Sequence, residues 1–174
     1  MKNRTLRQIT AAGVIAAAYA ALSLVLALIT FGPVQCRVSE ALTLLPVLSP
    51  AAIWGVTLGC AITNGVGAAT GANFLGMVDL FVGTAATLLA AVASRLLGKI
   101  RFGGVPWLSA LPPILFNAVA IGAEWCYAAT GSINVAFWAF AGQIALGQLP
   151  PCLLGVWLIH LLERRGLQNI IEGK

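Results

Sequence analysis

Charged side chains are scarce in this sequence. Of its 174 residues, only 9% are Asp, Glu, Lys or Arg, whereas 60% are hydrophobic. Soluble domains carry about 25% charged residues, which cover the apolar core with a polar surface. Ten basic and five acidic residues are too few for such a surface. The composition therefore excludes an ordinary soluble domain and favours a protein that lies in a lipid bilayer.

Catalytic and metal-binding motifs are also absent. There is one histidine, and the four cysteines are dispersed without a C-x-x-C pair, so neither a zinc site nor a disulfide framework is indicated. The sequence contains no H-E-x-x-H, no G-x-S-x-G and no Walker A motif. We therefore expect no enzyme activity, no catalytic residues, no cofactor and no metal in this chain.

The basic residues that are present fall in three clusters, each next to a long apolar run: Lys2, Arg4 and Arg7; Arg95, Lys99 and Arg101; and Arg164, Arg165 and Lys174. This layout is typical of cytoplasmic loops under the positive-inside rule and argues against nucleic-acid binding. The first apolar run covers 23 residues, from Ile9 to Phe31, which is too long for the core of a signal peptide. It predicts a retained membrane helix.

The number of spans follows from length and parity. A membrane helix needs about 20 apolar residues, and the ranges 9–31, 77–97, 106–129 and 134–162 each supply them. Residues 41–78 carry no charge and are ambiguous. If all the basic clusters are cytoplasmic, the chain crosses an even number of times between Arg7 and Arg95. We therefore expect two short spans, 36–48 and 51–67, separated near Pro46 and Pro50.

These spans predict an all-α membrane protein. Residues 1–174 are expected to form a single transmembrane domain, a compact bundle of six transmembrane helices with both termini in the cytoplasm. The short second span would need neighbouring helices to shield its ends from lipid.

Three carboxylates from three different expected helices share the outer half of this bundle. They are Glu40, Asp79 and Glu124, and Arg37 is the only basic residue at the same depth. Carboxylates in membrane helices are costly and usually face a partner or a cavity. Since Arg37 neutralises at most one of them, the remaining negative charge favours a cation or a ligand with several N–H donors.

Amides and aromatic side chains accompany the carboxylates. The expected ligand-binding residues are Arg37, Glu40, Asn64, Asp79, Asn117, Glu124, Trp138 and Gln143, with Trp125, Phe74 and Phe137 at similar depth. Structural roles stay open for each of them alone: the tryptophans in the interfacial belt, Glu124 facing headgroups, the amides as interhelical contacts, and Arg37 with Glu40 as a helix-start ion pair.

Small residues recur every four positions on the first helix. Ala12, Ala16 and Ala20 form one stripe, and Gly13, Ala17 and Ala21 form another. Such stripes let a second helix approach closely, either within the bundle or from a partner protein. We assign the stripe of Ala12, Ala16 and Ala20 to partner binding. A channel is disfavoured because the inner half of the bundle is almost wholly apolar.

Four segments resemble the QueT family of substrate-binding S components of energy-coupling factor transporters. They are residues 34–46 (VQCRVSEALTLLP), 59–64 (GCAITN), 79–84 (DLFVGT) and 111–117 (LPPILFN), the last followed by Glu124. The resemblance covers about residues 5–160. Cys36 departs from it, because a small aliphatic residue is expected at that position.

The resemblance implies a function. S components bind a vitamin-like compound near the outer face of the bacterial plasma membrane and dock on a membrane T component with two cytoplasmic ATPases. The QueT family implies a queuosine precursor, 7-aminomethyl-7-deazaguanine or queuine. Glu124 or Glu40 is then expected at the guanine edge and Asp79 at the amine. The alternatives are an S component for another nitrogenous vitamin, or a small membrane scaffold that transports nothing.

Overall fold

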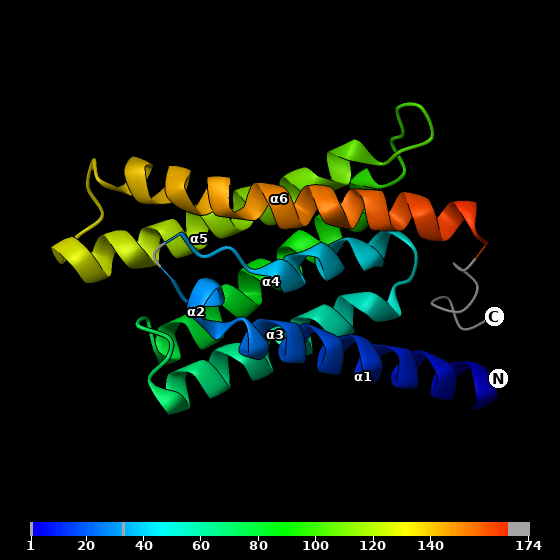
Figure 1. Cartoon of the computed structure of the whole chain (residues 1–174), viewed down its shortest axis with the longest axis horizontal. Coiled ribbons are helices and arrows are strands. Elements are labelled where there is room, and N and C mark those ends of the chain that lie inside the picture. Colours follow the sequence, from blue (N-terminus) through cyan, green and yellow to red (C-terminus); the bar gives the residue numbers. More distant parts are fainter. Residues whose placement is uncertain (1, 33, 167–174) are drawn as a thin grey trace.

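Helices account for most of the described residues. The computed structural model describes residues 2–32 and 34–166, so Lys174 of the third basic cluster lies outside the described residues. The elements are α1 (Lys2–Val25), α2 (Ala27–Thr30), η1 (Val38–Val47), α3 (Ala51–Thr70), α4 (Met77–Leu97), η2 (Trp107–Ala110), α5 (Leu111–Thr130) and α6 (Phe137–Arg164), where η marks a 3₁₀ helix (Figure 1).

Among the described residues, five helices are long and apolar enough to cross a membrane. They are α1, α3, α4, α5 with its leading turn η2, and α6. The start of α1, the connection from α4 to α5 and the end of α6 lie at the same end of the bundle (Figure 1). At this end Arg101 forms an ion pair with Glu163, with Nη1 2.6 Å from Oε2. The bundle therefore gathers the segments that carry basic clusters at one end.

The second span differs from the expected helix over 36–48. It is the 3₁₀ helix η1, which contains ten residues including Pro46. A 3₁₀ helix rises about 2.0 Å per residue, so η1 extends about 20 Å, less than the ~30 Å hydrocarbon core of a bilayer. Of the six expected transmembrane helices, five are long enough to cross a membrane, and the second, which was expected to be short, is a short 3₁₀ segment.

The surroundings of η1 explain why this short segment is tolerated. It packs against α1, α3, α4 and α6, and seven of its ten residues are buried. Irregular backbone occurs at membrane depth only where protein covers it, since lipid offers no hydrogen bonds. The segment η1 is thus a central element, and it carries Glu40 into the interior of the bundle.

The contact between α1 and α3 corrects the expected partner stripe. Ala16 and Ala20 are buried, and the carbonyl oxygens of Ala12 and Ala16 lie against Gly55 and Gly59 of α3. The stripe of Ala12, Ala16 and Ala20 therefore packs the bundle itself, because helices approach closely where side chains are small. All three residues of the second stripe, Gly13, Ala17 and Ala21, are exposed.

Gly59→Ala is predicted to destabilise the α1–α3 contact. The added Cβ would lie 2.6 Å from Cβ of Tyr19 and 2.9 Å from the carbonyl oxygen of Ala16. Such overpacking costs about 1–3 kcal/mol. Gly65→Ala on the same helix is the control, since its Cβ would meet nothing closer than 3.8 Å. Thermal unfolding in detergent should give a lower Tm for Gly59→Ala only, and equal Tm values would contradict the contact.

Candidate ligand-binding site

A buried ion pair lies in the half of the bundle away from the termini. Nη2 of Arg37, just before η1, is 3.9 Å from Oδ2 of Asp79 in the first turn of α4. The exposed fraction is 5% for Arg37 and 0% for Asp79. Breaking a buried pair leaves a charge without compensation, so the two residues hold η1 and α4 together.

Neighbouring amides complete this pair. Nη2 of Arg37 donates to Oδ1 of Asn64 over 3.1 Å, and Nδ2 of Asn73 donates to Oδ2 of Asp79 over 2.7 Å. The local sequence makes room for these bonds, because a Cβ at Gly83 would overlap Oδ1 of Asp79 and lie 2.8 Å from Nδ2 of Asn64. The guanidinium also faces the ring of Phe31, 5.8 Å from its centroid.

Glu40 has a different partner. The hydroxyl of Tyr19 in α1 donates to Oε1 of Glu40 over 2.6 Å, and both residues are buried. Next to them, the hydroxyls of Ser23 and Ser39 are 2.5 Å apart. Oε2 of Glu40 has no hydrogen-bond partner among the described residues. One oxygen of Glu40 is therefore free for another group, as is Oδ1 of Asp79.

Glu124 is the carboxylate with no partner at all. Both of its carboxylate oxygens are buried and neither has a hydrogen-bond partner among the described residues. It lines a cavity of about 510 Å³ between α4 and α5, whose other walls include Phe74, Val78, Val119 and Tyr127. A carboxylate without donors is costly in such apolar surroundings. The cavity therefore contains a hydrogen-bond acceptor that a ligand with N–H or O–H donors could satisfy.

Aromatic rings stack behind Phe74, which lines the same cavity. The ring of Trp125 stacks on Phe74 with centroids 5.4 Å apart and on Phe140 with centroids 6.4 Å apart. Nε1 of Trp125 is buried without a hydrogen-bond acceptor among the described residues. Phe74 of the cavity wall is thus backed by a second aromatic ring, and a flat apolar surface of this kind suits a flat heterocycle.

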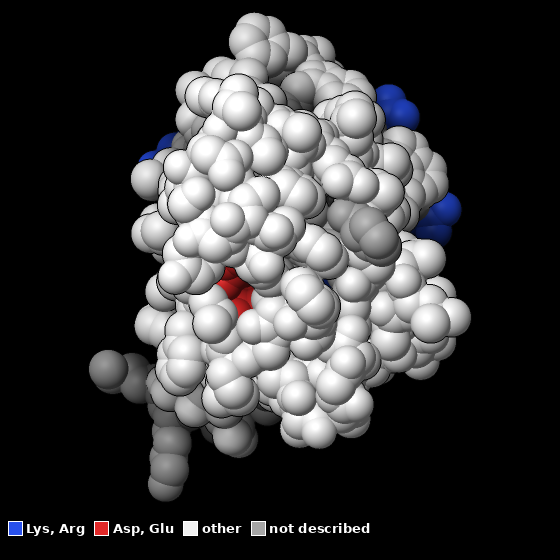
Figure 2. All heavy atoms as spheres, turned by 90° about the vertical axis from the view of Figure 1, so that its left-hand side faces the viewer, with Lys and Arg blue, Asp and Glu red and all other residues white. Residues whose placement is uncertain are grey.

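The end of the bundle away from the termini has a hollow in its surface. Figure 2 views the end of the molecule opposite to the termini, and acidic atoms are visible at the bottom of a hollow in a face that otherwise carries almost no charge. Of the three carboxylates in this half, Glu40 and Asp79 are 1% and 0% exposed, whereas Glu124 is partly exposed.

The residues that were expected to bind ligand differ in how deeply they are buried. Arg37, Glu40, Asn64, Asp79 and Asn117 are all buried in the interior. Gln143 is partly buried in α6. Trp138 is 75% exposed and packs edgewise on Phe137, so its contact with a ligand stays a prediction, while Trp125 stacks on Phe74 of the cavity wall.

Sequence reasoning missed three polar residues of this region. Tyr19 and Asn73 were missed because their roles come from hydrogen bonds that only the fold makes, from Tyr19 to Glu40 and from Asn73 to Asp79. Gln148 is buried in α6, with Nε2 3.5 Å from the carbonyl oxygen of Gln35 and Oε1 without a partner among the described residues. The sequence could have indicated Gln148, since an amide within a long apolar run is uncommon.

Comparisons with known proteins give one match. A family model described as "QueT transporter" matches residues 9–164. No curated protein and no solved structure matches the chain.

Arg37→Met is predicted to lower the free energy of unfolding by about 3–5 kcal/mol, because it leaves Asp79 buried without its cation. Arg101→Met is the matched control. It removes the more exposed ion pair with Glu163, for which a loss of about 0–1 kcal/mol is expected. Denaturant titration in detergent micelles measures both. Losses of similar size would show that the Arg37–Asp79 pair contributes no more than a surface pair.

Proposed function

The chain belongs to the QueT transporter family, a family of S components of energy-coupling factor transporters, and we propose that it is the substrate-binding subunit for a queuosine precursor. The proposed ligand is 7-aminomethyl-7-deazaguanine or queuine. The chain would hold this ligand in the bilayer for high-affinity uptake and would depend on other chains for ATP hydrolysis.

The free carboxylate of Glu124 carries this proposal. A deazaguanine presents N1–H and an exocyclic amine side by side, and a carboxylate accepts such a pair only if both of its oxygens are free. Of the three carboxylates, Glu124 has two free oxygens, whereas Glu40 and Asp79 have one each. We therefore assign the guanine edge to Glu124.

The remaining groups suit the rest of the ligand. Its cationic aminomethyl group needs one acceptor, and the free oxygen of Asp79, or that of Glu40, supplies it. Its carbonyl oxygen needs a donor, for which Nε1 of Trp125 joins the expected amides Asn117 and Gln143. The flat ring would pack on the aromatic surface of Phe74 and Trp125.

The proposed assembly follows from the family and from the exposed face of α1. We orient the basic end toward the cytoplasm of a bacterial cell by the positive-inside rule, with both termini inside. The partners would be a membrane T component and two ATPases. Because Ala16 and Ala20 are buried, we place the docking contact on the exposed stripe of Gly13, Ala17 and Ala21.

Glu124→Gln is predicted to weaken binding of 7-aminomethyl-7-deazaguanine by about 1–3 kcal/mol, a factor of about 5 to 150 in Kd, because a charged acceptor is lost. Calorimetric titration of the purified protein measures the affinity. Glu163→Gln is the control, since Glu163 pairs with Arg101 at the far end of the bundle.

Titration of the unmodified protein with a panel of deazaguanines and other nitrogenous vitamins tests the function itself. Tight binding of a different vitamin would replace the proposed substrate, and no binding by any compound would favour a scaffold. An unchanged Kd for Glu124→Gln would remove Glu124 from the site.

Ala17→Leu and Ala21→Leu are predicted to reduce co-purification with the T component while leaving ligand affinity unchanged. Both alanines are exposed, so a larger side chain would block close approach of a partner helix without disturbing the α1–α3 contact. Ala85→Leu, at an exposed position of α4, is the control. Co-purification equal to that of the control would place the docking contact elsewhere.

A further inference from the structure

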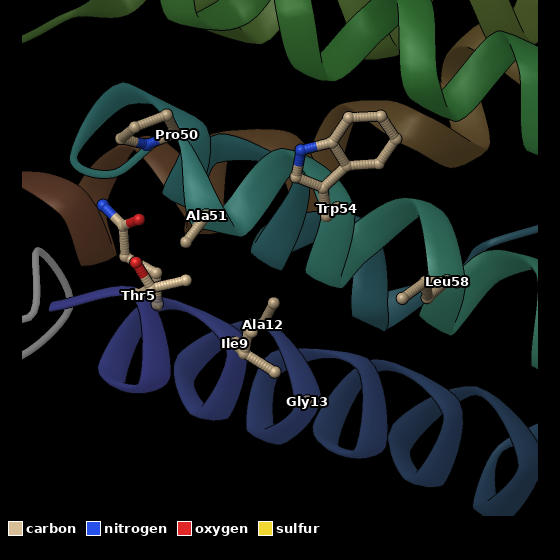
Figure 3. Close-up of a pocket in the computed structure, with 9 residues that line it drawn as sticks. Thr5, Ile9, Ala12, Gly13, Pro50, Ala51, Trp54 and Leu58 are labelled. Carbon is tan, nitrogen blue, oxygen red and sulfur yellow. The ribbon is translucent and has the colours of Figure 1, made fainter. Parts of the chain in front are cut away.

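A groove runs between α1 and α3 near the end of the bundle that holds the chain termini. Its volume is about 470 Å³, and the two helices form its walls (Figure 3). The lining residues are Thr5, Gln8, Ile9, Ala12 and Gly13 from α1, Pro50 just before α3, and Ala51, Trp54 and Leu58 from α3. This groove is separate from the cavity beside Glu124, which lies between α4 and α5.

Small side chains leave the groove open. Ala12 and Ala51 project into the space between the two helices (Figure 3), and a Cβ added at Gly13 would meet no atom within 4 Å. Farther along α1 the gap closes, because Ile15 and Tyr19 pack tightly on Gly55 and Gly59. The groove is therefore a short slot that ends inside the membrane-spanning part of the bundle.

The lining changes in polarity along α1. Thr5 and Gln8 supply a hydroxyl and an amide in the first turns, whereas Ile9, Ala12 and Gly13 are apolar and follow deeper in the helix. Leu58 continues the apolar wall on α3. Trp54 is 63% exposed, and tryptophan at such a position favours the boundary between headgroups and acyl chains. A polar mouth above an apolar slot matches an amphiphile.

Two exposed arginines, Arg4 and Arg7, lie in the same first turns of α1 as the polar mouth, although neither lines the groove. Arg4 and Arg7 flank Thr5 and Gln8 in sequence and are both exposed. Within residues 2–32 and 34–166, neither arginine has an ion-pair or side-chain hydrogen-bond partner, whereas Arg95 donates to the carbonyl oxygen of Pro46 and Arg101 pairs with Glu163. These two arginines are therefore available for an external anion.

We propose that this groove binds one anionic phospholipid. An acyl chain would lie in the slot along Ile9, Ala12 and Leu58, and the phosphate would lie at the mouth near Thr5 and Gln8, attracted by Arg4 and Arg7. The complementarity of charge selects an anionic headgroup over a zwitterionic one. This site does not use Glu124, and it shares only Gly13 with the exposed stripe of Gly13, Ala17 and Ala21.

Native mass spectrometry of the isolated protein tests the proposal. Delipidated protein is mixed with equal amounts of phosphatidylglycerol and phosphatidylcholine that carry identical acyl chains. Each basic residue near a headgroup favours an anionic lipid about fivefold, so two predict a preference of about 25-fold for a single bound phosphatidylglycerol. Arg4→Gln with Arg7→Gln should reduce this preference to near unity while one lipid still binds.

Gly13→Leu tests the slot. Its side chain would enter the open space and should reduce the one-lipid adduct at least about fivefold, the loss expected for an excluded acyl segment. Ala17→Leu is the matched control, because Ala17 is exposed one turn farther along α1 and does not line the groove. Equal binding of the two lipids by the unmodified protein would overturn the proposal. Unchanged lipid binding by Gly13→Leu with loss of T-component co-purification would assign the groove to a protein partner instead.

Discussion

The ion pair between Arg37 and Asp79 is the interaction on which the half of the bundle away from the termini depends. In a low-dielectric interior a single unpaired charge is far more costly than a pair, so the chain must bring the start of η1 to the first turn of α4. Asn64 and Asn73 supply the remaining hydrogen bonds, and the absence of a side chain at Gly83 leaves space for them. The central position of η1 follows from this requirement.

The same requirement divides the three carboxylates by role. Asp79 is held by Arg37 and Asn73, Glu40 is held on one side by Tyr19, and Glu124 is held by no described residue. Polar groups that a fold satisfies contribute to stability, whereas a polar group left free in an apolar cavity costs stability until a ligand meets it. Asp79 therefore has the partners expected of a structural residue, whereas Glu124 has the free oxygens expected of a ligand-binding residue.

Different faces of helix α1 pack against the bundle and face outward. Ala16 and Ala20 face the interior, where small side chains allow close packing on α3, while Ala17 and Ala21 face outward. Its first turns add a third use, since Thr5, Gln8 and Gly13 line the groove toward α3. One helix can present these different surfaces because neighbouring positions are separated by about 100° around its axis.

Length, hydropathy and charge are local properties of the chain, so the sequence was enough to predict a membrane protein and the approximate positions of its long helices. It also showed that Glu40, Asp79 and Glu124 lie among apolar residues, where carboxylates are unusual. The packing of the helices was needed to show that the second span is a 3₁₀ helix, that Ala16 is buried, that Trp138 is exposed and that Trp125 stacks on Phe74. Those outcomes depend on which helices pack together. Whether the oxygens of Glu124 find a partner likewise depends on residues distant in sequence, which a local pattern does not reveal.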